Sequence, residues 1–110
     1  MTVSQKTRKL VYQRDNYRCV HCGATEGLTL QHRINRQMGG SKTRDGIENL
    51  LTLCGLANHR LEVNSTFAAK GVTLGWKLRS WQNPTEVPVW YEPDGNFFIL
   101  TERGTRIRRD

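Results

Sequence analysis

Membrane-spanning and secreted proteins carry features that this sequence lacks. No apolar run approaches the length of about 18 residues that a membrane-spanning helix needs, and the first residues do not lead into the apolar core of a signal peptide. Acidic residues are also scarce, because ten Asp and Glu stand against 17 Lys and Arg, for a formal net charge of +7. We therefore expect a cytoplasmic protein without a membrane partner that binds a polyanion, with nucleic acid as the first candidate.

Cysteine is rare as well, and its three copies cannot all pair in disulfides. Thiols stay reduced in the cytoplasm, so the Cys19-x-x-Cys22 pair and Cys54 point to metal before disulfide. Thiolates separated by two residues can converge on one ion, and Gly23 permits the tight turn that follows them. The sequence therefore predicts a structural zinc site at Cys19, Cys22 and Cys54 that lacks one ligand of a tetrahedral set.

At 110 residues the chain fits a single domain over residues 1–110, because a chain of this size buries roughly 65% of its unfolded surface in one core. The pattern of apolar, polar and turn residues predicts an α+β fold. The expected elements are a helix over residues 4–15 capped by Ser4, a zinc knuckle over 18–23, a strand over 28–32, a long loop over 33–46, a short strand over 50–53, a helix over 58–70 ended by a left-handed Gly71, a β-hairpin with its turn at 93–95, and a further strand near 105–108.

The order of these elements suggests a ββα-metal unit, in which two strands and a helix bind one cation. Residues 4–71 would hold the N-terminal helix, the knuckle and this unit, and residues 72–110 would form a C-terminal β extension.

Three polar side chains stand out within the cysteine frame, namely His32, Asn49 and His59. His32 precedes a loop that contains Gly39-Gly40, Asn49 heads a leucine-rich run, and His59 opens a helical segment. This arrangement resembles the HNH endonucleases, which use one divalent metal to hydrolyse phosphodiester bonds in DNA. By motif the resemblance covers roughly residues 8–62, and toward the C-terminus the chain looks similar to small phage-encoded HNH proteins.

By this resemblance His32 is the general base that activates water, a role suited to an imidazole with an unperturbed pKa of about 6.5. Asn49 has no proton to transfer, so its contribution has to be geometric: its amide can pin the preceding loop and orient the base. His59 is the implied metal ligand, with Gln31 at the position of the second ligand and Glu62 as a further carboxylate on nearly the same helical face. The implied cofactor is one catalytic divalent cation (Mg²⁺, Mn²⁺, Ni²⁺ or Zn²⁺) that stabilises the leaving group.

Two positions depart from the pattern of the family. Gln31 offers a neutral amide oxygen, which is a weaker ligand than a carboxylate or an imidazole. Asn58 stands where family members commonly have a fourth cysteine. The fourth zinc ligand is therefore open between His21, a water molecule and, as a distant third, Asp15.

Basic side chains near the trio are expected to contact DNA phosphates, because arginine forks match phosphate oxygens bidentately. They are Arg33, Arg36, Lys42 and Arg44. The implied function is a metal-dependent DNA endonuclease that nicks one strand or cleaves both, acting as a monomer or homodimer, in the host cytoplasm if the chain is phage-encoded.

Two other functions stay open. One is a zinc-stabilised DNA-binding module with a decayed nuclease site, because Gln31 and Asn58 depart from the strongest ligand types. The other is an accessory subunit of a phage DNA-packaging machine, which would work only with a terminase or portal protein.

Overall fold

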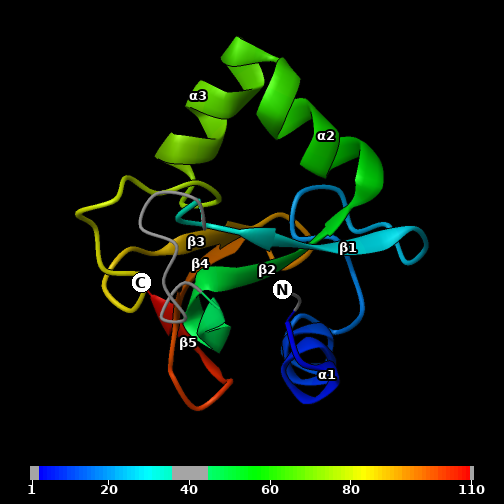
Figure 1. Ribbon diagram of the computed structural model, residues 1–110, viewed down its shortest axis with the longest axis vertical. Coiled ribbons are helices and arrows are strands. Elements are labelled where there is room, and N and C mark those ends of the chain that lie inside the picture. Colours follow the sequence, from blue (N-terminus) through cyan, green and yellow to red (C-terminus); the bar gives the residue numbers. More distant parts are fainter. Residues whose placement is uncertain (1–2, 36–44, 110) are drawn as a thin grey trace.

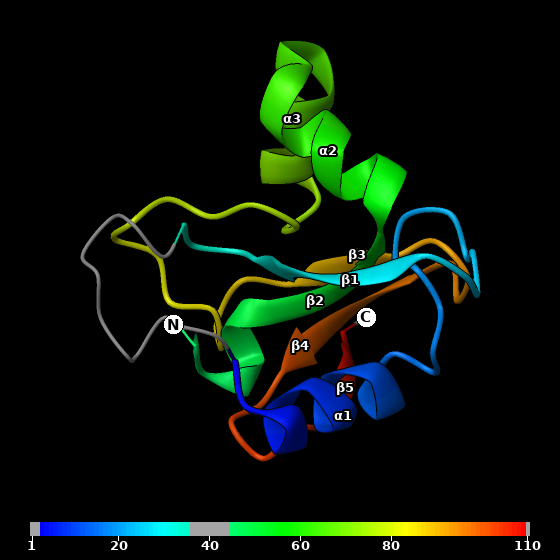
Figure 2. The ribbon, with the colours of Figure 1, turned by 45° about the vertical axis from the view of Figure 1, so that its right-hand side comes forward.

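The structure, a computed structural model, describes residues 3–35 and 45–109 and has an α+β fold, as the sequence predicts. A two-stranded hairpin separates helix α1 (Gln5–Arg14) from helices α2 (Gly55–Val63) and α3 (Ser65–Thr73), which lie on its other side in both views (Figure 1, Figure 2). A second sheet, from the C-terminal part of the chain, completes the fold. In the two described ranges, no helix is long and apolar enough to cross a membrane.

The central hairpin pairs strand β1 (Leu28–His32) with strand β2 (Leu50–Cys54) in antiparallel register. β1 has the bounds expected from its alternating sequence, and β2 extends the expected strand to Cys54. A short 3-10 turn, η2 (Ile47–Asn49), leads into β2, and His32 pairs with Leu50. His32 and Asn49 therefore lie at the same end of the hairpin, while α2 starts at the opposite end and packs against both strands.

The helices begin where side chains cap them. Ser4 accepts a hydrogen bond from the Thr7 backbone N–H at 3.1 Å and starts α1, as predicted. The single helix expected over residues 58–70 is instead two helices, because Asn64 adopts an extended conformation (φ −112°, ψ 110°). Its side chain accepts the Phe67 N–H at 2.8 Å, so Asn64 ends α2 and caps α3.

Gly71 does not end a helix, and the prediction of a left-handed conformation there is wrong. Gly71 lies within α3, where an added Cβ would come within 2.7 Å of Leu61 on α2. The glycine therefore allows α2 and α3 to pack closely. The left-handed glycine in this part of the chain is Gly75 (φ +81°), just after α3.

The C-terminal residues form a three-stranded antiparallel sheet of β3 (Val89–Tyr91), β4 (Asn96–Leu100) and β5 (Arg106–Arg109). The predicted hairpin is β3 with β4, and the further strand expected near residues 105–108 is β5. Buried apolar side chains from the strands, from α2 and α3 and from the connecting segments share one core, among them Val20, Leu51, Leu53, Leu61, Trp76, Val89 and Leu100.

A buried polar cluster around Asp15 joins three elements. The Asp15 carboxylate pairs with the Arg14 guanidinium at 2.8 Å and accepts hydrogen bonds from the Tyr91 hydroxyl at 2.5 Å and the Thr52 N–H at 3.0 Å. Burial, and then the nearby Asp15 carboxylate, raise the pKa of Tyr91 well above its ordinary value. Asp15 thus ties the end of α1 to β2 and β3.

Candidate functional site

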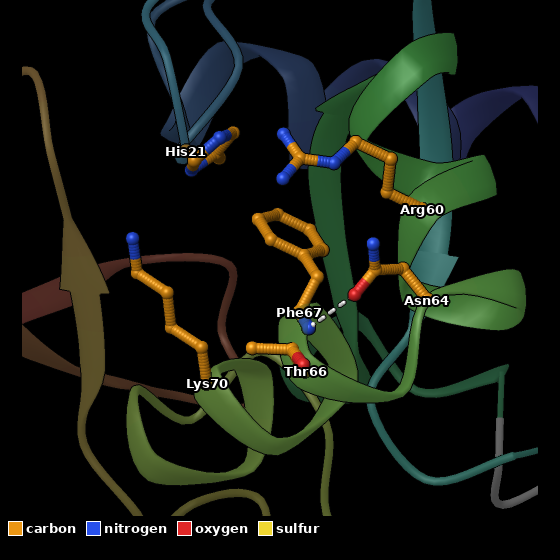
Figure 3. A pocket seen from close by; sticks show the side chains of 6 residues that line it. All are labelled: His21, Arg60, Asn64, Thr66, Phe67 and Lys70. Carbon is orange, nitrogen blue, oxygen red and sulfur yellow. Dashed lines mark hydrogen bonds between the residues drawn. The ribbon is translucent and has the colours of Figure 1, made fainter.

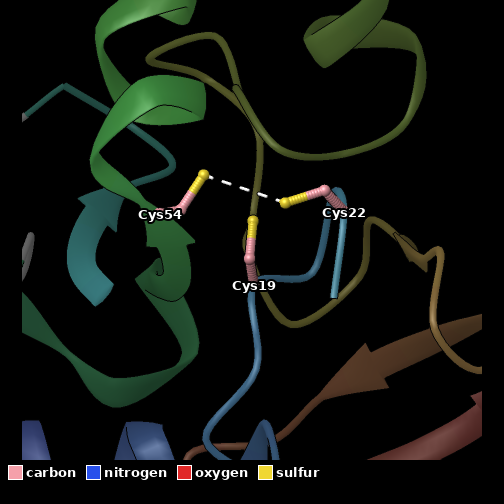
Figure 4. A group of neighbouring side chains, drawn as sticks. All are labelled: Cys19, Cys22 and Cys54. Atoms are coloured by element: carbon pink, nitrogen blue, oxygen red, sulfur yellow. Dashed lines mark hydrogen bonds between the residues drawn. The ribbon is translucent and has the colours of Figure 1, made fainter. Parts of the chain in front are cut away.

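The three cysteines converge on one point beside the hairpin (Figure 4). Cys19 and Cys22 come from the turn after α1, and Cys54 comes from the junction of β2 and α2. Their sulfur atoms all lie within 4.8 Å of one another, and the Cys22 and Cys54 sulfurs are 3.8 Å apart. A tetrahedral zinc with zinc–sulfur bonds of about 2.3 Å has sulfur–sulfur edges of about 3.8 Å, so this cysteine cluster has the size and chemistry to bind zinc.

The surroundings of the cysteine cluster shift the pKa values of Cys19 and Cys54 in opposite directions. Burial raises the pKa of Cys19 to about 11. Burial also acts to raise the pKa of Cys54, but the backbone N–H groups at the start of α2, with Ala57 the largest, and the neighbouring thiols outweigh it, so this pKa is lowered. Cys54 is therefore disposed to ionise before Cys19, and a metal would have to displace the proton of Cys19.

None of the side chains considered as a fourth ligand is held toward the sulfurs. The Asp15 carboxylate is engaged in its own buried cluster, and the His21 ring packs edge-on against Trp76, with centroids 5.1 Å apart. Asn58 donates from Nδ2 to Thr29 Oγ1 at 2.8 Å. Within residues 3–35 and 45–109, no His, Asp or Glu joins the cysteine cluster.

Asn49 holds the backbone that leaves β1. Its side chain is buried, its Oδ1 accepts the Ile34 N–H at 2.8 Å, and its Nδ2 donates to the Ile34 carbonyl at 3.2 Å. Its own carbonyl accepts the Arg33 N–H at 2.8 Å. These bonds clamp the two residues after His32.

His32 pairs with Asp45, a residue that the sequence interpretation missed. The Nε2 atom of His32 lies 2.9 Å from Oδ1 of Asp45, and the two side chains are 26% and 14% exposed. A carboxylate in this position fixes the orientation of the imidazole ring. The available signal was that Asp45 is the single acidic residue between His32 and Glu48.

The residues proposed to hold a catalytic cation are less closely assembled. Gln31 is 7% exposed and donates from Nε2 to the His32 carbonyl at 2.7 Å, so its Oε1 is the atom left to act as a ligand. Side chains alternate along a strand, so Gln31 lies on the same face of β1 as Thr29. Thr29 contacts α2 through its hydrogen bond with Asn58. His59 and Glu62 lie exposed on α2, and in the described part of the chain they belong to no three-ligand cluster.

The expectation that Arg33 contacts DNA is wrong. Arg33 is 0% exposed, and its guanidinium donates to four backbone carbonyls at 2.8 to 3.1 Å. Those carbonyls belong to Glu48, Gly75, Pro84 and Val87. Burial lowers the pKa of Arg33 to about 9, so the group stays charged at neutral pH and cross-links the fold.

The other three basic residues assigned to phosphate contact, Arg36, Lys42 and Arg44, lie outside the described residues.

The candidate site thus has two separate parts. The cysteine cluster lies where α2 begins, whereas the His32–Asp45 pair and the Asn49 clamp lie at the other end of the hairpin. Among known proteins, no family model matches the chain, and no curated protein or solved structure is significantly similar to it.

Proposed function

We propose that this protein is a metal-dependent DNA endonuclease in which His32 activates the attacking water. The observation that carries the proposal is the His32–Asp45 pair next to the Asn49 clamp. Asn49 fixes the backbone that follows His32, and Asp45 fixes its imidazole ring. A histidine fixed in both ways has the constant position that a general base needs. The net charge of +7 supports a polyanionic substrate.

Each side chain has a separate task in this proposal. With its Nε2 proton donated to Asp45, His32 keeps Nδ1 to accept the proton of water, and the carboxylate stabilises the imidazolium that forms. Asn49 keeps the ring at a constant place by holding the backbone. A divalent cation bound by His59 and Gln31 Oε1, with Glu62 nearby, would stabilise charge on the departing oxygen, with phosphate oxygens and water completing its shell.

The cysteine cluster has a structural task in this proposal. A zinc ion there would join two segments that are far apart along the chain: the turn after α1, which carries Cys19 and Cys22, and the start of α2, which follows Cys54. Such a site contributes directly to folding stability.

A second candidate is a zinc-stabilised DNA-binding module without nuclease activity. It is favoured by the weak ligand at Gln31, whose amide is already bonded to the His32 carbonyl, and by the exposed positions of His59 and Glu62. This module would bind DNA and leave it intact.

A plasmid nicking assay separates the two candidates. Wild type, His32→Ala and Asp45→Asn would be incubated with supercoiled DNA and Mg²⁺, Mn²⁺ or Ni²⁺, with Glu102→Gln as the control for loss of an exposed carboxylate. We expect His32→Ala to lose roughly 10²- to 10⁴-fold of the rate, Asp45→Asn to lose roughly 10- to 100-fold, and the control to cut normally. Equal cutting by wild type and His32→Ala would exclude the proposed base.

A further inference from the structure

A pocket of about 400 Å³ lies between the turn that carries Cys19 and Cys22, which we call the cysteine turn, and the two helices that follow β2 (Figure 3). We call it the basic pocket. It is lined by His21, Arg60, Asn64, Thr66, Phe67 and Lys70. None of these residues takes part in the cysteine cluster or in the proposed hydrolytic site.

Three nitrogen-bearing groups converge on the basic pocket. Figure 3 shows the Arg60 guanidinium, the Lys70 ammonium and the His21 ring directed toward one another beside the Phe67 ring. The Arg60 guanidinium lies 4.2 Å from the centroid of the Phe67 ring, and the His21 ring meets Phe67 edge-on with centroids 4.9 Å apart. The groups come from the cysteine turn, α2 and α3, so the fold itself brings them together.

The side chains that line the basic pocket include no anion to pair with Arg60 and Lys70. The lining of the basic pocket contains no Asp or Glu, and within the described ranges neither Arg60 nor Lys70 forms an ion pair or a side-chain hydrogen bond. Glu92 is close enough to act electrostatically on His21, but it does not line the basic pocket, and its carboxylate accepts the Trp90 indole N–H at 2.8 Å. Like charges that face one another without a counter-charge favour binding of an anion between them.

The chemistry of the pocket selects a phosphate group. A guanidinium presents parallel N–H donors that match two phosphate oxygens, and a lysine adds a point charge. The N-cap Asn64 and the first turn of α3, which contributes Thr66, bring the positive end of a nine-residue helix to the same place. The Phe67 ring is already covered by Arg60 and His21, which leaves no free aromatic face on which a base could stack.

We infer that the basic pocket binds a backbone phosphate of nucleic acid, at a point separate from the hydrolytic site. The inference rests on the proposed function only in taking DNA as the polymer. Arg60 and Lys70 are exposed, so a single free ion would be held weakly, whereas a phosphate of a strand anchored elsewhere on the protein arrives at high effective concentration. The pocket would thereby fix how the strand lies across α2 and α3.

The test measures duplex binding in a His32→Ala background, so that cleavage does not interfere. Affinity for a fluorescent 20-base-pair duplex would be measured from about 50 to 200 mM salt, for this protein and with Lys70→Gln or Arg60→Gln added. We expect each addition to weaken binding several-fold and to lower the slope of log K against log[salt] by about 0.9, the value for one lost phosphate contact. Lys9→Gln is the matched control, because it removes an exposed charge from α1 on the opposite side of the hairpin (Figure 1).

The outcomes separate this inference from the nuclease proposal. Unchanged affinity and slope in both pocket variants overturn the inference, whatever the nicking assay shows. Tight binding of inorganic phosphate by wild type, lost in Lys70→Gln while duplex binding stays the same, overturns the nucleic-acid assignment in favour of a small phosphate ligand. If nicking does not depend on His32 but the slope falls in the pocket variants, the nuclease proposal fails and the basic pocket stands. Melting curves check folding, with Lys70→Gln as the safer variant because Arg60, although also exposed, packs over the Phe67 ring.

Discussion

Replacing Asn49 with alanine tests the clamp that supports His32. The substitution removes the acceptor of the Ile34 N–H and the donor to the Ile34 carbonyl, and Ile34 is 2% exposed. A buried backbone group left without a partner costs about 1–3 kcal/mol, so the two groups together cost about 2–6 kcal/mol. This is a large part of the 5–15 kcal/mol over which small domains are stable, as an order-of-magnitude range.

The expected loss is measurable by thermal unfolding. For a domain of about 100 residues, 1 kcal/mol corresponds to roughly 4 °C or more in melting temperature, so Asn49→Ala should melt at least about 8 °C below wild type. The matched control is Asn83→Ala, because Asn83 is exposed and its side chain bonds only nearby groups in the 83–86 turn. That variant should change stability far less.

The same variant should lose activity even where it is folded. Nicking would be measured well below the melting temperature of Asn49→Ala, and we expect a loss of roughly 10- to 100-fold, because the residues after His32 are no longer held. Asn49→Ala could instead have the melting temperature and the cutting rate of wild type. The clamp would then have no supporting role, and the argument that His32 is a positioned base would be refuted.

Three further predictions concern the zinc, the buried tyrosine and the catalytic cation. Elemental analysis should find one zinc per chain, and Cys22→Ser should lose most of it and melt earlier; an unchanged zinc content would contradict the cysteine cluster as the binding site. Tyr91→Phe should cost about 1–3 kcal/mol because Asp15 loses a donor. Because folding raises the pKa of Tyr91, its contribution is complete below about pH 10 and is lost as the pH rises further, so alkaline titration of the unfolding midpoint should be steeper in wild type than in Tyr91→Phe. His59→Ala should abolish nicking while the circular-dichroism spectrum stays native, since His59 is exposed; a collapsed spectrum would show that His59 is a structural residue.

Local patterns were enough to predict the elements that depend on neighbouring residues. The alternation in residues 28–32 predicted β1, and Ser4 predicted the start of α1, because both signals act over a few positions. The sequence predicted that Cys19, Cys22 and Cys54 come together, and the structure brings the three thiols into one cluster. A single helix over residues 58–70 failed because capping by Asn64 outweighed the helical propensity of the segment around it.

The errors at the candidate site involve contacts between distant segments. Nothing in the sequence near Arg33 indicates that carbonyls from Gly75, Pro84 and Val87 surround its side chain. His32 and Asp45 are likewise 13 positions apart, beyond the reach of rules that act over a few neighbouring residues. Arg60 and Lys70 belong to different helices, and their convergence depends on the bend at Asn64.

The buried Arg33 has a consequence for how the polypeptide can be divided. Three of the four carbonyls that accept its hydrogen bonds come from residues 75–87. A chain cut after residue 71 would therefore keep the Arg33 guanidinium and lose most of its hydrogen-bond acceptors. The hairpin that bears His32 is therefore not an autonomous unit to which the C-terminal strands were appended. Grafting that hairpin onto another scaffold, or shortening the protein from its C-terminus, would require replacing Arg33 with an apolar residue first.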